Sequence, residues 1–163
     1  MNNTLTEILQ HNAGSDTHGM TFIESHADEV RMSYKALYME ACHTLAALRA
    51  RGVQQGGEVV IQVEDNRMLL VTFWACILGG MVPVPLSVGG RTAHLEKFAA
   101  VWSTMSDPDW VVEKSYEDRM LRFLAEKARP LPATGRTFDP AELLQYPQVA
   151  TPVSVSPASL AYI

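Results

Sequence analysis

Short apolar runs alternate with helical patterns along most of this chain, and this alternation limits the folds open to it. The runs at 58–63, 81–86 and 110–112 are strand-like, whereas 34–48, 68–78 and 92–105 have helical apolar patterns. A further helix is predicted from a capping box at Ser115 and Asp118 to about residue 128. Strands that alternate with helices through short connections pair in parallel. The sequence predicts an α/β fold: a three-layer arrangement with a mostly parallel sheet flanked by helices.

The segment 20–52 has a different pattern from the rest. After an amphipathic opening around Leu5, two short strands are predicted at 20–24 and 30–32, joined by a turn. Ser33 is placed to cap the helix that follows, and Gly52 to end it in a left-handed conformation. Whether 20–52 joins the main sheet or forms a separate sub-lobe is left open by the sequence.

Prolines indicate where the sheet ends. Pro83 and Pro85 alternate within one predicted strand, and because proline cannot donate to a sheet ladder, that strand is predicted to be an edge or to leave the sheet. From residue 129 to 158 the chain is rich in proline and is expected to cross the surface, with one helical turn at 139–142. The last five residues, 159–163, begin an apolar strand, which predicts that the chain is truncated or is one segment of a longer protein.

Composition and charge exclude several classes of function. The 163 residues are 47% hydrophobic and 19% charged, as expected of a globular domain. The net charge of -5 disfavours nucleic acid and anionic membranes as partners. With no signal peptide and no apolar run of about 20 residues, we expect a cytoplasmic protein. Cys42 and Cys76 lie in helical patterns and are expected to be buried free thiols.

A search for catalytic motifs identifies no catalytic, cofactor-binding or metal-binding residue. The chain has no G-x-x-x-x-G-K-S/T phosphate loop, no dinucleotide fingerprint and no G-x-S-x-G elbow. No two of its five histidines share a helix face at the i, i+4 spacing of metal sites. Its glycine pairs are interpreted as helix ends and turns.

Asp65, Asn66 and Ser87 are the candidate residues of a binding crevice. They follow predicted strands, and open α/β sheets bind ligands beyond the carboxyl ends of their strands. Glu64 and Asp65 could pair around magnesium, but the later aspartate and lysine that such a site needs are missing. The other interpretation, which the sequence favours, is that Asp65 and Asn66 cap the next helix.

Three stretches together resemble the adenylate-forming superfamily. Residues 32–37, MSYKAL, with the helix end 48–53, LRARGV, resemble its first core motif. Residues 57–66, GEVVIQVEDN, resemble its G-D-x-V strand and the Asn that opens the next helix. Residues 73–86, FWACILGGMVPVPL, resemble the second core motif, A-x-x-x-G-x-x-x-V-P-L. This superfamily includes acyl-CoA synthetases, fatty acyl-AMP ligases and nonribosomal peptide synthetase adenylation domains. Within it, the residues of these motifs are most similar to those of acyl-ligase domains of polyketide and peptide assembly lines.

The resemblance implies a ligase whose catalytic and nucleotide-binding residues lie beyond this part of the sequence. Such an enzyme uses ATP and Mg to activate a carboxylate as acyl-AMP, then passes the acyl group to CoA or to the phosphopantetheine thiol of a carrier protein. The family residues for these steps follow Ile163, since the strand at 160–163 resembles the one that leads into the phosphate loop. We therefore expect residues 1–163 to be an N-terminal fragment that holds no cofactor, is inactive alone and needs the remainder of the adenylation domain.

A different class of function is also open. The chain could be a stand-alone interaction or assembly module, in which an apolar face forms a homodimer. Carboxylate substrate, acceptor thiol and oligomeric state are not determined by the sequence.

Overall fold

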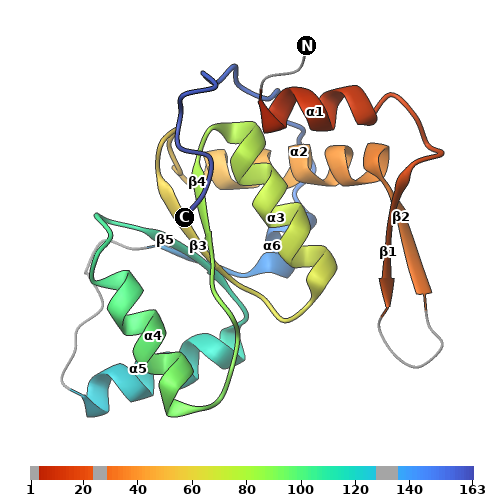
Figure 1. The fold of residues 1–163 in the computed structure, drawn as a ribbon. Helices are drawn as coiled ribbons and strands as arrows, with labels where there is room; N and C mark the ends of the chain where they lie inside the picture. The colour runs from red at the N-terminus through yellow and green to blue at the C-terminus, as the bar shows by residue number, and fades with distance from the viewer. Residues whose placement is uncertain (1–3, 24–28, 128–135) are drawn as a thin grey trace.

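Four parallel strands form a sheet at the centre of the computed structural model, which describes residues 4–23, 29–127 and 136–163 (Figure 1). Strand β3 is buried on both sides: Val59 and Ile61 face one core cluster, and Val60 faces the other. A strand covered on both faces has a nearly continuous apolar sequence, so the predicted central strand is confirmed. In sheet order the strands are β4 (Val82–Pro85), β3 (Glu58–Gln62), β5 (Asp109–Val112) and β6 (Thr137–Phe138).

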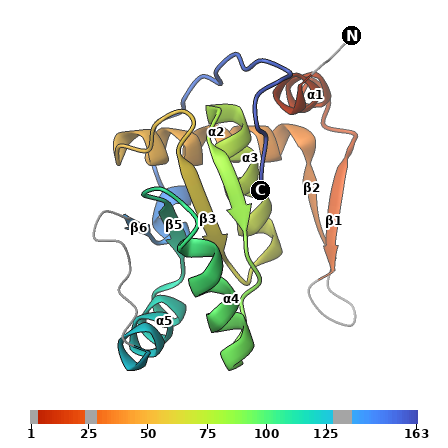
Figure 2. The ribbon, with the colours of Figure 1, turned by 60° about the vertical axis from the view of Figure 1, so that its left-hand side comes forward.

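Helices cover both faces of this sheet, which confirms the predicted three-layer α/β fold (Figure 2). On one face, α2 and α3 pack against each other and against β3, with α1 and α6 beside them. On the other face, α4 and α5 enclose an aromatic cluster in which Phe98, Trp102 and Trp110 lie 4.7–5.8 Å apart by ring centroid. The helices are α1 (Leu5–Asn12), α2 (Tyr34–Ala50), α3 (Asn66–Gly79), α4 (Thr92–Trp102), α5 (Lys114–Glu126) and α6 (Pro140–Leu144).

Segment 20–52 contributes to two different parts of the fold. Strands β1 (Gly19–Ile23) and β2 (Glu29–Ser33) pair antiparallel in a sheet of their own. Helix α2, which follows directly, places Leu37 and Leu45 in the same core cluster as the central strand. The predicted cap is confirmed, since the Ser33 side chain accepts a hydrogen bond from the backbone N–H of Ala36 at 3.1 Å. Most of the predicted turn, residues 25–28, and Glu24 lie outside the described residues.

The prolines of β4 confirm that this strand is an edge. The backbone N–H of Val82 donates to the carbonyl of Gly57, just before β3, and that of Leu86 donates to the carbonyl of Ile61 in β3. The intervening Pro83 and Pro85 therefore face outward. The predicted strand at 159–163 is wrong: the segment runs beside β4 but makes only one backbone hydrogen bond to it, from Ile163 N–H to the Pro83 carbonyl at 3.3 Å. An edge without outward N–H donors at two alternate positions supports only part of a ladder.

Two predicted helix boundaries are corrected. Helix α4 ends at Trp102 and not at residue 105. The capping box at Ser115 is wrong, because α5 already begins at Lys114. Glu113 holds the N-cap position without capping the helix, since its carboxylate accepts a hydrogen bond from Glu64 N–H at 3.1 Å instead. The predicted end near residue 128 lies outside the described residues, and α5 is described to Glu126.

The described part of the proline-rich segment, 136–158, pairs with β5 at its start and is then held against α2 and α3. The predicted helical turn is confirmed as α6, capped by Asp139, whereas β6 was not predicted. Cys42 and Leu78 accept backbone hydrogen bonds from this segment, and His43 Nδ1 donates to the Gln148 carbonyl at 2.9 Å. His43, on the polar side of α2, thus holds the crossing segment against its helix.

Cys42 and Cys76 are free thiols and both are buried, as predicted. Burial raises the pKa of each thiol, so the reactive thiolate form is disfavoured at neutral pH. Among the described residues no helix has the length and apolar character needed to cross a bilayer.

A two-point ion pair joins β5 to the segment before β6. Asp109 is only 4% exposed, and its two carboxylate oxygens accept hydrogen bonds from Arg136 Nε at 2.8 Å and Nη2 at 2.9 Å. Arg136 Nη1 also donates to the backbone carbonyl of Arg51, at the end of α2. The beginning of β5, the approach to β6 and the end of α2 are therefore held together by one side chain.

We predict that Arg136→Ala lowers the free energy of unfolding by about 2 kcal/mol, because it leaves the buried Asp109 carboxylate unpaired; the loss stays below that of a fully buried pair since Arg136 is partly exposed. Arg136→Lys keeps the charge without the two-point contact and should cost about 1 kcal/mol. Urea unfolding followed by circular dichroism measures both changes.

Arg51→Ala is the matched control. It removes the exposed ion pair with Glu142 and should change the free energy of unfolding by less than about 0.5 kcal/mol. If the Arg51 and Arg136 variants lose equal stability, the Asp109 pair has no special role.

Candidate functional site: the carboxyl edge of the sheet

The chain changes direction across the sheet between β3 and β5. From β3 it passes through α3 to β4 at one edge, and from β5 it passes through α5 to β6 at the other. Helices α3 and α5 lie on opposite faces of the sheet. In open parallel sheets, ligands bind beyond the carboxyl ends of the strands at such a switch point. This edge is therefore where a site is expected.

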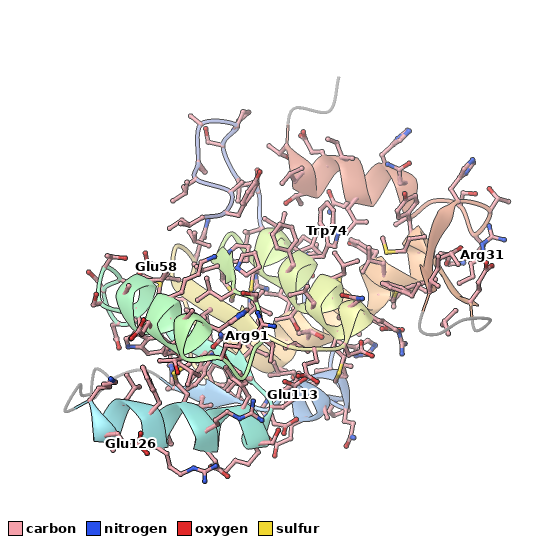
Figure 3. All side chains as sticks on the ribbon, turned by 60° about the horizontal axis from the view of Figure 1, so that its bottom comes forward. Arg31, Glu58, Trp74, Arg91, Glu113 and Glu126 are labelled. Carbon is pink, nitrogen blue, oxygen red and sulfur yellow. The ribbon has the colours of Figure 1, made fainter. Side chains whose placement is uncertain are left out.

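The space directly between β3 and β5 is bridged by protein. Glu113, labelled in Figure 3 where α5 begins, accepts the hydrogen bond from Glu64 N–H across this gap. A hollow of about 370 Å³ lies instead beyond the ends of β3 and β4, and we call it the carboxyl-edge pocket. Its lining residues are Val63, Glu64, Asn66, Leu69, Pro85, Leu86, Ser87 and Val88.

The structure separates the three residues that the sequence proposed for the crevice. Asn66 and Ser87 both line the carboxyl-edge pocket, one from the start of α3 and the other from the segment after β4. Asp65 does not line it; its carboxylate accepts a hydrogen bond from Met68 N–H at 2.7 Å and caps α3. The capping interpretation is thus confirmed for Asp65, whereas Asn66 is the first residue of the helix.

Polar and apolar groups contribute about equally to the surface of the carboxyl-edge pocket. Its polar lining comes from Glu64, Asn66 and Ser87, and none of the described lining residues is basic. Within the described ranges, no three His, Cys, Asp or Glu side chains come together as metal ligands would. A polyphosphate would meet a carboxylate here and no cation, so these residues favour an uncharged group over phosphate.

A buried polar network behind the pocket was missed in the sequence. Gln62, at the end of β3, is fully buried, and its Nε2 lies 3.4 Å from both the Ser87 carbonyl and the Tyr116 hydroxyl. The Tyr116 hydroxyl in turn donates to the Gly89 carbonyl at 3.4 Å. A glutamine directly after the buried apolar residues 59–61 was the signal available, because buried polar side chains need partners.

A second hollow, of about 510 Å³, lies near the amino end of β4. It is formed by the start of α1, by residues 55–56 and 80–82, and by the segment 155–161. No titratable side chain is among the residues that line it in the described structure. Its lining hydroxyl groups therefore have no titratable side chain beside them, among the described lining residues, to act as a general base.

The profile of the AMP-binding enzyme family matches residues 9–162. The chain belongs to this family. The match covers both the antiparallel β1–β2 sheet and the parallel sheet, so the resemblance found in the motifs is confirmed over nearly the whole chain.

Solved structures of the AMP-binding family share the fold. An adenylation domain of a keto acid-selecting NRPS module, bound to keto acyl adenylate, is 25% identical with a TM-score of 0.85; the match covers 99% of this chain and 30% of that one. McyG A-PCP complexed with phenylalanyl-adenylate is 26% identical, with a TM-score of 0.85; the match covers 98% of this chain and 29% of that one. A fatty acyl-adenylate ligase from L. pneumophila, at 19% identity and a TM-score of 0.78 over 99% of this chain and 28% of that one, shows the same fold.

Curated relatives match shorter stretches. The salicyl-AMP ligase / salicyl-S-ArCP synthetase of Mycobacterium tuberculosis is 34% identical over 70 residues, which is 43% of this chain and 12% of that protein. Enterobactin synthase component E of Escherichia coli is 28% identical over 96 residues, which is 59% of this chain and 17% of that protein. These matches and those to the solved structures above thus span less than a third of each protein.

We predict that Asp65→Ala lowers the free energy of unfolding by about 1 kcal/mol, the usual cost of losing a helix N-cap. Asp65→Asn should retain most of the stability, since asparagine is also a good N-cap. Asn66→Ala is the control at the neighbouring position and should have a smaller effect. Urea unfolding distinguishes the three; a larger loss for Asn66→Ala than for Asp65→Ala would contradict the assignment.

Proposed function

We propose that this chain is the N-terminal part of an ATP-dependent ligase that activates an acyl or aminoacyl carboxylate as acyl-AMP and transfers it to the thiol of CoA or of a carrier protein. The observation that carries the proposal is the family match over residues 9–162, together with the adenylation-domain fold over 99% of the chain. Solved structures with this fold are named for keto acyl, phenylalanyl and fatty acyl adenylates, and one sequence relative is named for salicyl-AMP. Such different acids on one scaffold support a general adenylating role and leave the carboxylate open.

The proposal assigns ATP and Mg to the enzyme as a whole and not to these residues. The carboxyl-edge pocket has no basic lining residue, and the described residues include no metal-ligand cluster. This part of the chain would then supply the scaffold, while the remainder of the adenylation domain supplies the nucleotide contacts. In-line attack on the α-phosphate depends on positioning and on charge stabilisation, which a rigid scaffold supports.

An apolar surface supports contact with the remainder of that domain. Phe73 and Trp74, on the outer side of α3, are only partly buried, and the ring of Tyr162 lies 6.0 Å from that of Phe73. Tyr162 itself is 57% exposed. Apolar groups gathered in this way are typical of a surface that another part of the protein covers.

We predict that residues 1–163 alone do not catalyse carboxylate-dependent exchange of pyrophosphate into ATP, whereas the longer protein that this proposal requires does. The measurement uses labelled pyrophosphate and a panel of amino, aryl, keto and fatty acids, with the acid omitted as the control. Exchange by residues 1–163 alone would show that the site is complete here. No exchange by the longer protein with any acid would contradict the ligase, and a stable homodimer of residues 1–163 in sedimentation would then favour the assembly module.

A further inference from the structure

The segment 86–91, which we call the β4–α4 loop, forms one wall of the carboxyl-edge pocket through Leu86, Ser87 and Val88. Two side chains from other elements hold its backbone. Gln62 on β3 donates to the Ser87 carbonyl, and Tyr116 on α5 donates to the Gly89 carbonyl. The two side chains are also joined to each other, because Gln62 Nε2 donates to the Tyr116 hydroxyl. The loop is thus connected to the central strand and to a helix on the opposite face from α3.

Helices α4 and α5 enclose the other side of this loop. A Cβ atom on Gly89 would lie 2.5 Å from His94 Nδ1, and one on Gly90 would lie 3.1 Å from Arg119 Nη1. The Arg119 guanidinium also lies over the Tyr116 ring, 5.8 Å from its centroid. A larger residue at Gly89 would require His94 to move, so the side chains of α4 and α5 lie close against this side of the loop backbone.

Gln62 is an unusual residue for its position. It is fully buried, and its Oε1 has no hydrogen-bond partner among the described residues. A buried amide with one unpaired atom is less stable there than an apolar side chain of similar length would be. The three hydrogen bonds of the network, each 3.4 Å, are long and compensate this cost poorly. Stability of the strand alone therefore does not account for a glutamine here.

We propose that Gln62 and Tyr116 are positioning residues: through the carbonyls of Ser87 and Gly89 they set the conformation of the β4–α4 loop and so the shape of the carboxyl-edge pocket. Neither side chain lines the pocket itself. The link between this pocket and catalysis rests on the adenylating function proposed above. Because the described lining carries no basic group, the loop should affect binding of the uncharged part of the carboxylate substrate more than binding of ATP.

The first test measures amide hydrogen exchange in residues 86–91 of this chain. Tyr116→Phe removes only the hydroxyl, and Gln62→Met keeps the length of the side chain while removing the amide. In each variant, exchange of the Leu86 amide, which donates to the Ile61 carbonyl at 2.9 Å where the loop begins, should rise about fivefold, the factor expected for a lost neutral hydrogen bond. Because both residues act through one network, the double variant should exceed the larger single effect by less than about twofold.

Tyr38→Phe is the matched control for this test. It also removes one tyrosine hydroxyl from a helix, but Tyr38 packs against the core cluster on the other face of the sheet. Exchange in 86–91 should not change in this variant. Equal increases in Tyr38→Phe and Tyr116→Phe, or no increase in either pocket variant, would overturn the proposal.

The second test uses pyrophosphate exchange by the longer protein. Tyr116→Phe and Gln62→Met should raise the KM for the carboxylate about fivefold and change the KM for ATP by less than about twofold. Faster amide exchange with both KM values unchanged would overturn the link to the pocket while leaving the ligase intact. If the wild-type protein shows no pyrophosphate exchange, the proposed function fails, and the hydrogen-exchange test still decides whether the network positions the loop.

Discussion

Burial of β3 on both faces is the constraint on which the rest of the fold depends. Its valines and isoleucine alternate between two core clusters, so apolar helices are needed on each side of the sheet. Helices α2 and α3 meet this need on one face, and α4 and α5 on the other. Because β3 also lies between β4 and β5, its carboxyl end contributes to both the pocket and the polar network behind it. One central strand thus connects the core of the molecule to its candidate site.

Much of the fold could be predicted from the sequence because it depends on local chemistry. Ser33, Asp65 and Asp139 cap helices through side chains close to the backbone groups that they bind, and Pro83 with Pro85 defines an edge strand by removing donors. The predictions that were wrong concern elements whose hydrogen-bond partners are far apart in the chain. Glu113 does not cap α5 because Glu64, which is 49 residues away, supplies its hydrogen bond. The two residues of β6 are too few to produce a periodic pattern.

The candidate site could be predicted only in outline. The rule for parallel sheets placed a crevice at the carboxyl edge, and Asn66 and Ser87 do line a pocket there. The same rule could not show that Glu113 and Glu64 bridge the switch point, or that Gln62 reaches both Ser87 and Tyr116. These contacts depend on which helix lies above which strand, and hydrophobic spacing does not contain that information. The sequence motifs, in contrast, identified the family, because they are inherited within a family and can be recognised without knowing the contacts.

The prolines of β4 have a consequence for how molecules of this protein meet. The outward side of this strand carries the carbonyl of Pro83, which already accepts one hydrogen bond, and neither Pro83 nor Pro85 has an N–H to give in return. If the β4 edges of two copies met, backbone carbonyl oxygens would face each other at these positions with no N–H donors between them. Pairing of β4 with β4 of another copy is therefore disfavoured there. The strand can still receive a neighbour that contributes the missing donors. The edge of β4 therefore disfavours pairing with an identical edge and favours a segment that supplies N–H donors, as Ile163 of the same chain does.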